Sequence, residues 1–475
     1  MKQRQTSSWP LIVLVTGVAV CLFWQVTASN LSIGALVILV ALAMAVLASP
    51  WRYLTAVLVL WVVTPEIRRL IDWQMGYGSI SALSALPLAT LLVPGFALFA
   101  GGWFRVPLPL LGLAWLWIAG LAYGLAVGLA SDLGPAALYA FAQFGLPALL
   151  GLWLVSWSAP AARVHDRLAA LLLGIATLVS LYGIYQYVAL PPWDSEWMIN
   201  SGMGAPIGKP EPFGLRVFSV LNSPAPCAGF LVLTLLFNLP RLQTGRPGLL
   251  LQGSLCLAAL SLTFVRSAWI GLIAGLVLYL LLSPGRMRLL KPGLALAGVV
   301  GLLAFAVPAL MGGDLVSQQV QARVESLGNL PNDISFNERR VLLEQQIARF
   351  GLQPQGNGLG STGTATKLNR PLNEWQVLHV DNGYLARLIE MGLPGVLCYL
   401  ATLAGGLLLV MDRWRTRRGG EAALTAAVAA SQVALLLLDI AGDSHSALLG
   451  LFFWLGLGLV ELPESSPCSV PCSTP

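Results

Sequence analysis

The chain has 475 residues, of which 57% are hydrophobic and only 10% are charged, and its formal net charge at pH 7 is +6. This composition and the mean hydropathy of +0.77 exclude a soluble globular protein and are typical of a protein built within a membrane. Because membrane topology explains the basic excess, the net charge gives no reason to expect nucleic acid as a partner.

Apolar stretches long enough to cross a bilayer recur along the chain. We therefore predict an all-α polytopic membrane protein with about 12–14 transmembrane helices. The first span follows Met1–Arg4 without a clear small-residue cleavage site, so we expect it to be retained. The candidate spans are 10–28, 31–49, 51–65, 79–100, 108–130, 137–157, 167–190, 225–240, 248–264, 268–283, 292–311, 382–410, 422–441 and 445–462.

Charge placement predicts the orientation of these spans. Alternate short connections carry 15 of the 27 Lys and Arg residues, as the positive-inside rule expects for the cytoplasmic side. Both termini are then cytoplasmic, and the polar segment 312–381 lies outside. The residues that define the cytoplasmic side are Lys2, Arg4, Arg52, Arg105, Arg163, Arg167, Arg241, Arg246, Arg286, Arg288, Lys291, Arg413, Arg415, Arg417 and Arg418.

Positive charge on the outer side is disfavoured and needs a reason. Arg266 has apolar helices on both sides, and an arginine at membrane depth costs about 2.5–3.5 kcal/mol, so it is a candidate functional residue unless it snorkels to the headgroups. Arg216 is either a functional residue or a solvated charge in a loop. Arg68 and Arg69 are expected to be structural, partly paired with the acidic residues of segment 65–73. The outward residues are Arg68, Arg69, Lys209, Arg216, Arg266, Arg323, Arg339, Arg340, Arg349, Lys367, Arg370 and Arg387.

The external segment is predicted to contain an amphipathic helix. Residues 335–338 have the pattern of a capping box, and the helix is expected to end near Gly351. Arg339 and Arg340 flank its apolar stripe, so they are candidates for docking a lipid headgroup or diphosphate. Packing on the outer ends of other helices is compatible with this role, and the sequence does not separate the two. The stripe consists of Phe336, Leu343, Ile347 and Phe350.

A glycine-rich stretch follows this helix. Residues 358–363 formally match Gly-x-Gly-x-x-Gly, but no strand precedes them and they face outward, which argues against a dinucleotide site. We interpret the stretch as a turn that lets the backbone approach a ligand or the following helix.

Titratable residues gather where the chain re-enters the membrane. Asp381 or Asn382 is a suitable N-cap for the helix that follows. His379 has no obvious local partner and is a candidate general base, a role that contributes roughly 10²–10⁴ in rate. Tyr384 and Arg387 are supporting candidates.

Further charges are expected on or beside this helix. Arg387 can pair with Glu390 at the i, i+3 spacing. Asp439 lies within apolar sequence, which suggests that it faces a cavity or pairs with an arginine. Asp439, Asp443 and His445 are all expected at the outer ends of the last two spans.

An outward site with several arginines and a candidate base suits an anionic, lipid-linked substrate. Arginine forks bind a diphosphate bidentately and stabilise charge as it leaves. Such a site needs no Mg²⁺, and the spacing of Cys468 and Cys472 does not form a zinc motif, so we expect neither a metal nor a cofactor.

Four segments resemble the bacterial O-antigen ligase and O-antigen or exopolysaccharide polymerase superfamily: Arg216–Gly229, Thr263–Ala268, Arg339–Gly360, and Asp381–Leu385 with Glu390–Gly395. The resemblance implies a metal-independent transfer of glycan from an undecaprenyl-diphosphate carrier to an acceptor hydroxyl. It also implies, by position, that Arg216 and Arg266 bind the diphosphate.

The chain departs from the family pattern at the base. Asp381 occupies the position of the family histidine, and His379 lies two residues earlier, so either residue is open as the base. The resemblance implies that an Asp-Asn pair favours a polymerase over a ligase. Ser219 also stands where a glycine is usual, and Asn222-Ser223-Pro224 replaces Asn-Pro-Asn.

We therefore expect an inverting glycosyltransferase of surface polysaccharide synthesis in the bacterial plasma membrane, with its site on the outer face. Its partners would be an undecaprenyl-diphosphate-linked oligosaccharide, a glycan or lipid acceptor, and membrane lipids. The alternatives are an O-antigen ligase, a transporter or flippase, and a non-catalytic scaffold. The expected organisation is 1–311, an N-terminal bundle; 312–381, an external subdomain; 382–464, C-terminal helices; and 465–475, a disordered cytoplasmic tail.

Overall fold

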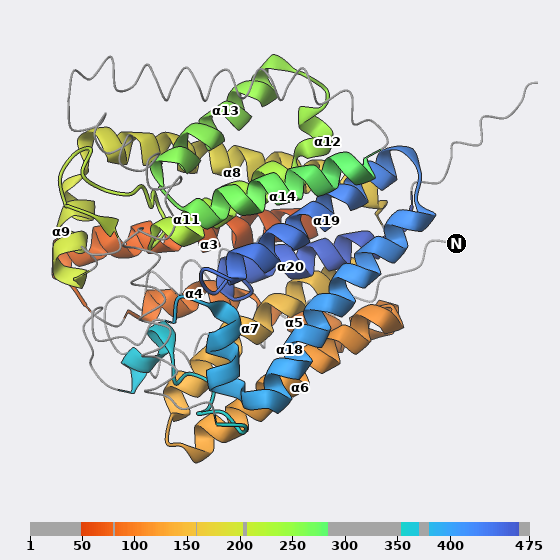
Figure 1. The fold of residues 1–475 in the computed structure, drawn as a ribbon, viewed down its shortest axis with the longest axis horizontal. Coiled ribbons are helices and arrows are strands. Elements are labelled where there is room, and N and C mark those ends of the chain that lie inside the picture. The colour runs from red at the N-terminus through yellow and green to blue at the C-terminus, as the bar shows by residue number, and fades with distance from the viewer. Residues whose placement is uncertain are drawn as a thin grey trace, which may run out of the picture.

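The computed structural model describes residues 49–78, 81–157, 159–202, 207–283, 353–369 and 380–464. Its named elements are all helical, as expected for an all-α polytopic membrane protein (Figure 1). They are α3 (Pro50–Met75), η1 (Ala82–Ala85), α4 (Leu86–Thr90), α5 (Leu92–Ala97), η2 (Leu98–Gly102), η3 (Trp103–Arg105), α6 (Leu108–Ala130), α7 (Gly134–Val155), α8 (Ala161–Ala189), α9 (Pro192–Ser201), α11 (Pro224–Phe237), α12 (Leu239–Leu242), α13 (Pro247–Leu262), α14 (Arg266–Leu282), η6 (Gly363–Leu368), α18 (Gly383–Thr416), α19 (Gly419–Asp439) and α20 (Ala447–Val460).

Six segments in these ranges are long and apolar enough to cross a membrane: Leu83–Arg105, Leu108–Ala130, Gly134–Val155, Ala161–Ala189, Gly383–Thr416 and Gly419–Asp439. Shorter apolar helices are Pro224–Phe237, Pro247–Leu262, Arg266–Leu282 and Ala447–Val460. The predicted spans from 51–65 to 268–283, and from 382–410 onward, coincide with these helices or with α3. The predicted spans 10–28, 31–49 and 292–311 lie outside the described residues.

Two of the predicted spans differ in detail. α3 continues to Met75, ten residues beyond the predicted end, and passes through Pro65. The span predicted at 79–100 is divided into short helical pieces, with Pro87 and Pro94 in α4 and α5 and a left-handed φ of 119° at Gly101. Proline removes a helical N–H and glycine tolerates positive φ, so both residue types favour such breaks.

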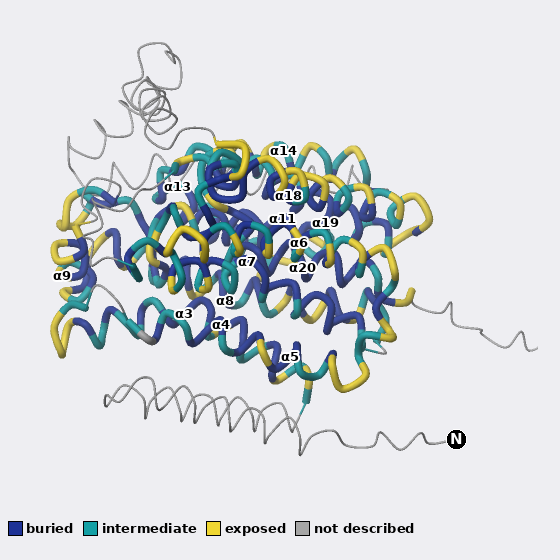
Figure 2. The backbone as a smooth tube through the Cα atoms, turned by 90° about the horizontal axis from the view of Figure 1, so that it is seen from below, coloured by how far each residue is buried: buried dark blue, intermediate teal, exposed yellow. Residues whose placement is uncertain are grey.

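Close packing of small residues joins the long helices. α14 lies beside α19, and α6 lies beside α18 (Figure 1). A Cβ on Gly151 of α7 would lie 2.2 Å from the carbonyl oxygen of Trp454 in α20. Such contacts between backbones are the usual way for membrane helices to associate. Buried residues consequently run through the middle of the bundle (Figure 2).

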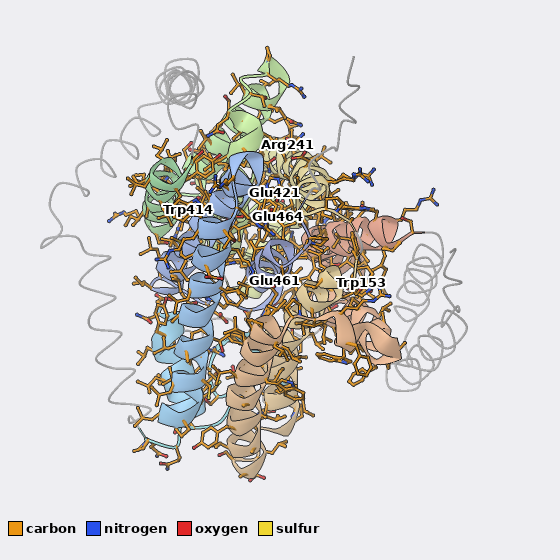
Figure 3. The ribbon with its side chains drawn as sticks, turned by 90° about the vertical axis from the view of Figure 1, so that its right-hand side faces the viewer. Trp153, Arg241, Trp414, Glu421, Glu461 and Glu464 are labelled. Atoms are coloured by element: carbon orange, nitrogen blue, oxygen red, sulfur yellow. The ribbon has the colours of Figure 1, made fainter. Side chains whose placement is uncertain are left out.

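Arginine side chains secure one end of the bundle, which we call the basic end and define by Arg413, Arg417 and Glu461. The buried Arg417 donates to the carbonyls of Val460 at 2.7 Å and Leu462 at 2.9 Å. Arg413 Nε lies 2.8 Å from Glu461 Oε1. Figure 3 labels Glu461 with Arg241, Trp414, Glu421 and Glu464, which come from α12, α18, α19 and the end of the described chain.

The chain reverses direction inside α18. Gly392 has φ 58° and ψ −166°, which breaks the helix into two arms. Tyr384 in the first arm and Tyr399 in the second lie with their ring centroids 6.4 Å apart. Because each tyrosine is seven or eight residues from Gly392, about 11 Å at 1.5 Å per residue, the arms run back along one another. We call residues 383–391 the re-entrant arm. The sequence predicted an uninterrupted span here.

The glycine turn, residues 353–363, packs into this reversal. Asn357 N–H donates to the Ile389 carbonyl at 2.7 Å, and Gly358 N–H donates to the Glu390 carbonyl at 3.0 Å. Leu393 N–H donates to the Pro354 carbonyl at 2.8 Å. The turn therefore satisfies backbone groups that the break in α18 leaves without helical partners. The prediction that it approaches the following helix is confirmed.

Replacing Gly358 by alanine is expected to destabilise the fold. Its φ of +95° costs a side-chain-bearing residue about 1–3 kcal/mol, and a Cβ would lie 2.4 Å from Gly128 Cα in α6. Gly363 is a matched control, because its φ is +68° but a Cβ there meets nothing within 4 Å. We expect the melting temperature in detergent to fall further for Gly358→Ala than for Gly363→Ala. Equal decreases would contradict this packing.

Candidate functional site

Two arginines from distant segments are brought to one place. Arg216 donates from Nε to the Thr263 carbonyl at 3.1 Å and from Nη2 to the Phe264 carbonyl at 3.4 Å. Arg266 follows two residues later as the first residue of α14. Both arginines are half-buried. The structure thus brings together the segments of the two predicted diphosphate-binding residues.

The turn between α13 and α14 makes this placement possible. Phe264 has a φ of 52°, a left-handed conformation that stops α13 and redirects the chain into α14. The Thr263 hydroxyl donates to the Leu260 carbonyl at 2.7 Å and accepts from the Val265 N–H at 3.3 Å. The Thr263 side chain therefore stabilises the turn from which Arg266 extends, and this turn lies between two apolar helices.

Arg68 and Arg69 make the ion pairs that are expected of residues with a structural role. Arg69 is fully buried and pairs with Glu66 and with Asp194 of α9, where Nε lies 2.8 Å from Oδ1. Arg68 Nε lies 3.3 Å from Asp72 Oδ2. The predicted pairing with Glu66 and Asp72 is confirmed, and Asp194 is an additional partner.

The start of α18 resolves the choice of N-cap. The Asn382 side chain accepts a hydrogen bond from the Leu385 N–H at 3.0 Å, so Asn382 is the cap. Asp381 lies immediately before it and is exposed. Its carboxylate is therefore not used in capping. The Tyr384 hydroxyl donates to the Leu436 carbonyl at 2.8 Å, which attaches the re-entrant arm to α19.

A buried ion pair stabilises the re-entrant arm. Arg387 Nη1 lies 2.7 Å from Glu390 Oε2, as the i, i+3 spacing predicted. Glu390 Oε1 accepts from the Thr362 hydroxyl at 2.7 Å and from its N–H at 3.2 Å. The guanidinium also lies 4.0 Å from the centroid of the Phe144 ring and 3.9 Å from Asp443. These contacts join the arm to the glycine turn, to α7 and to the loop before α20.

Asp439 pairs with a histidine, where the sequence suggested an arginine or a cavity. Its Oδ2 accepts from the Tyr399 hydroxyl at 2.6 Å, and its Oδ1 lies 3.5 Å from His445 Nδ1. The Ser444 N–H donates to the same carboxylate at 2.9 Å. Tyr399, Asp439 and His445 are all buried, so this cluster lies beneath the start of α18.

The arginines and the start of α18 lie at the same level of the bundle, opposite the basic end. A Cβ on Gly271 of α14 would lie 3.4 Å from the Ala434 carbonyl oxygen of α19. A Cβ on Gly275 would lie 3.0 Å from the Ala430 carbonyl oxygen, so α14 and α19 are antiparallel. Arg266 is five residues before Gly271 and Asp439 is five residues after Ala434, so the two are level. A Cβ on Gly383 would lie 2.4 Å from Asp439 Oδ1. We call this end the site end.

Three predicted site residues lie outside the described residues: His379, Arg339 and Arg340. The predicted amphipathic helix that carries the two arginines lies outside them as well. Among the residues that the structure describes, no group of three or more His, Cys, Asp and Glu side chains is arranged to hold a metal ion.

Sequence reasoning missed the polar residues that support the site from within the spans. Gln186 and Tyr182 of α8 and Tyr399 of α18 are buried or half-buried and hydrogen-bonded to charged groups. Their signal was a polar side chain within an apolar span, which needs a hydrogen-bond partner when it is buried.

Neutralising Glu390 is expected to destabilise the protein. Glu390→Gln removes the charge 2.7 Å from the buried Arg387, and breaking a buried pair costs about 3–5 kcal/mol. The matched control is Glu211→Gln, which alters an exposed contact of 3.8 Å with Lys209. Thermal unfolding in detergent should show a large decrease for the first variant and none for the second. Similar curves would contradict the role of the pair.

Comparison with protein families matches residues 253–400 to the model described as O-antigen ligase. The matched range contains Arg266, the glycine turn and the break at Gly392, whereas Arg216 precedes it and Asp439 follows it. The match supports membership of the O-antigen ligase/polymerase superfamily. Together with the apolar helices, it supports a multi-pass inner-membrane enzyme of surface glycan assembly. No curated protein matches the chain significantly.

Proposed function

We propose that this protein is a member of the O-antigen ligase/polymerase superfamily that transfers or polymerises oligosaccharide units from a polyprenyl-diphosphate carrier. One observation carries the proposal: the guanidinium of Arg216 is held against the turn that precedes Arg266, level with the start of α18. Two cations in one place at the site end suit a diphosphate, because guanidinium groups bind phosphate oxygens bidentately.

In the proposed reaction, an acceptor hydroxyl attacks the anomeric carbon of the lipid-linked glycan. The bond from that carbon to the diphosphate breaks, and the polyprenyl diphosphate leaves with the bonding electrons. Arg216 and Arg266 stabilise the charge that develops on the leaving group. A single displacement of this kind inverts the anomeric carbon. The reaction needs neither a metal nor another cofactor.

Asp381 is the proposed base that takes the proton from the acceptor hydroxyl. Its exposed carboxylate is next to the Asn382 cap and does not cap the helix itself. His379, two residues earlier, is the alternative base. Arg339 and Arg340 are proposed to dock the lipid headgroup. Asn382, Tyr384 and Arg387 are proposed to support the site by holding the re-entrant arm.

The proposed orientation puts both termini in the cytoplasm and the site end on the outer face of the plasma membrane. Segments rich in Lys and Arg remain preferentially on the cytoplasmic side, and the basic end carries Arg413, Arg415, Arg417 and Arg418. The products distinguish the candidate functions. A polymerase lengthens the lipid-linked glycan, a ligase moves it to a different acceptor, and a transporter releases no polyprenyl diphosphate.

Removing either site arginine is expected to reduce glycan transfer. Loss of one group that stabilises the developing charge costs about 10²–10³ in rate. Arg216→Ala and Arg266→Ala would be purified and incubated with a lipid-linked repeat unit, with and without a lipid acceptor, before the products are sized. Arg163→Ala, at an exposed position in the first turn of α8, is the control. Normal transfer by both site variants at wild-type protein levels would refute the proposal.

The identity of the base can be tested separately. Asp381→Asn keeps the shape of the side chain but removes its basicity, and it should lower the rate by about 10²–10⁴. His379→Gln should leave the rate close to that of the wild type. The measurement is single-turnover release of polyprenyl diphosphate. The opposite pattern would assign the base to His379, and two active variants would exclude both residues.

A further inference from the structure

Arg69 lies at the centre of a buried network that reaches the Arg216 segment. The side chain is fully buried, and its guanidinium donates to the carbonyls of Leu221 at 2.6 Å and Ser219 at 2.7 Å. The same group pairs with Glu66 and Asp194. One cation therefore joins α3 and α9 to the backbone just after Arg216.

The N–H groups of the same turn are held from α8. Gln186 Oε1 accepts from the Ser219 N–H at 2.8 Å and from the Phe218 N–H at 3.2 Å. The Gln186 amide nitrogen donates to Asp194 Oδ2 at 2.6 Å, so it is oriented by the partner of Arg69. Arg69 thus binds the carbonyls of the turn and Gln186 binds its N–H groups. Asp194 connects the two side chains.

The turn needs this support because its backbone is strained. Ser219 has a φ of 54°, a left-handed conformation that favours glycine. Its hydroxyl donates to the Val179 carbonyl at 2.6 Å. A serine stays in this conformation only where the surroundings hold it. A glycine at this position would make the turn more flexible, so the serine and its network restrict the positions open to Arg216.

The held turn determines where Arg216 can reach. Val217 N–H donates to the Leu262 carbonyl at 2.9 Å, directly before the turn that binds the Arg216 guanidinium. Arg216 N–H donates to the Ile207 carbonyl at 2.6 Å. The path from Arg69 through Ser219 to Arg216 is therefore three residues of constrained backbone, which is short enough to transmit a displacement.

The other acidic oxygens of the network are also satisfied. The Tyr182 hydroxyl lies 2.6 Å from Glu66 Oε1 and 2.9 Å from Asp194 Oδ2. Trp193 Nε1 donates to Glu66 Oε1 at 2.8 Å. Two carboxylates and one guanidinium are costly to bury, and apolar side chains of similar volume often stabilise a core as well or better. Stability alone therefore does not explain why charges occupy this position.

We propose that Arg69 is a positioning residue, which acts through the turn at Ser219 to place Arg216 for a lipid-linked diphosphate. The inference rests on the proposed function, since it concerns how the same site recognises its ligand. Arg69 itself is enclosed by Glu66, Asp194 and the turn carbonyls, so it does not need to touch the ligand.

Arg417 provides a matched control. It is also buried, donates to two backbone carbonyls and lies within 4.0 Å of two carboxylates, but it belongs to the basic end. Replacing Arg69 or Arg417 by lysine keeps the charge and removes the planar fork. If both residues only maintain the fold, the two variants should behave alike toward a ligand.

The test measures the dissociation constant of undecaprenyl diphosphate for the full-length protein in nanodiscs, with undecaprenol as the probe that lacks the diphosphate. We expect Arg69→Lys to weaken binding of the diphosphate lipid about tenfold, the change expected when a charge-assisted contact is misplaced. Binding of undecaprenol should not change, and Arg417→Lys should change neither. A similar loss in Arg417→Lys would overturn the inference.

A double-mutant cycle separates positioning from direct binding. If Arg69 acts through Arg216, then Arg69→Lys should change binding less than about twofold once Arg216→Ala is present. Equal effects in both backgrounds would overturn the inference. Should Arg69→Lys fail to fold, Gln186→Asn loosens the other side of the turn and should give the same pattern.

The outcomes also separate this inference from the proposed function. If the wild-type protein binds both lipids equally, the proposed diphosphate site is wrong and the inference falls with it. If Arg216→Ala weakens diphosphate binding but Arg69→Lys and Gln186→Asn do not, the proposed function stands and only the positioning role is refuted.

Discussion

The site end depends on hydrogen bonding between the glycine turn and the break at Gly392. Within a membrane every backbone polar group must find a protein partner, so a reversal of the chain is tolerated only where another segment supplies one. Asn357 and Gly358 supply N–H groups to the re-entrant arm, and Pro354 supplies a carbonyl to the second arm. Gly392 and Pro394 favour the break, and these bonds satisfy the backbone groups that it leaves without helical partners.

Charge compensation is the second common feature of the bundle. Arg69, Arg387 and Arg417 are each buried, and each is in contact with at least one carboxylate and with backbone or aromatic groups. The three networks serve different places: the turn after Arg216, the re-entrant arm, and the basic end. Each uses the guanidinium fork to bind several acceptors at once, which a lysine ammonium cannot reproduce in the same geometry.

Hydropathy and helix periodicity predicted most of the helices, but they did not predict how segments distant in sequence pack together. Hydropathy located 108–130 as a helix to the residue, and helix spacing predicted the Arg387–Glu390 pair. Hydropathy did not predict the reversal at Gly392, because it does not report where a helix turns back. Gly392 and Pro394 were the local signal for it, since both residue types favour a break in a helix. The contact between Arg69 and Ser219, 150 residues apart in sequence, follows from how α3, α8 and α9 come together, which periodicity does not report.

The re-entrant arm also bears on how the protein is made. It is about nine residues long and contains Arg387 and Glu390, so it is too short and too charged to be inserted as a separate membrane segment. Its partners include Phe144, which is synthesised long before it, and Leu436 and Asp439, which are synthesised after it. The site end can therefore form only when the last helices have left the ribosome, which makes assembly of the site a late step in biogenesis.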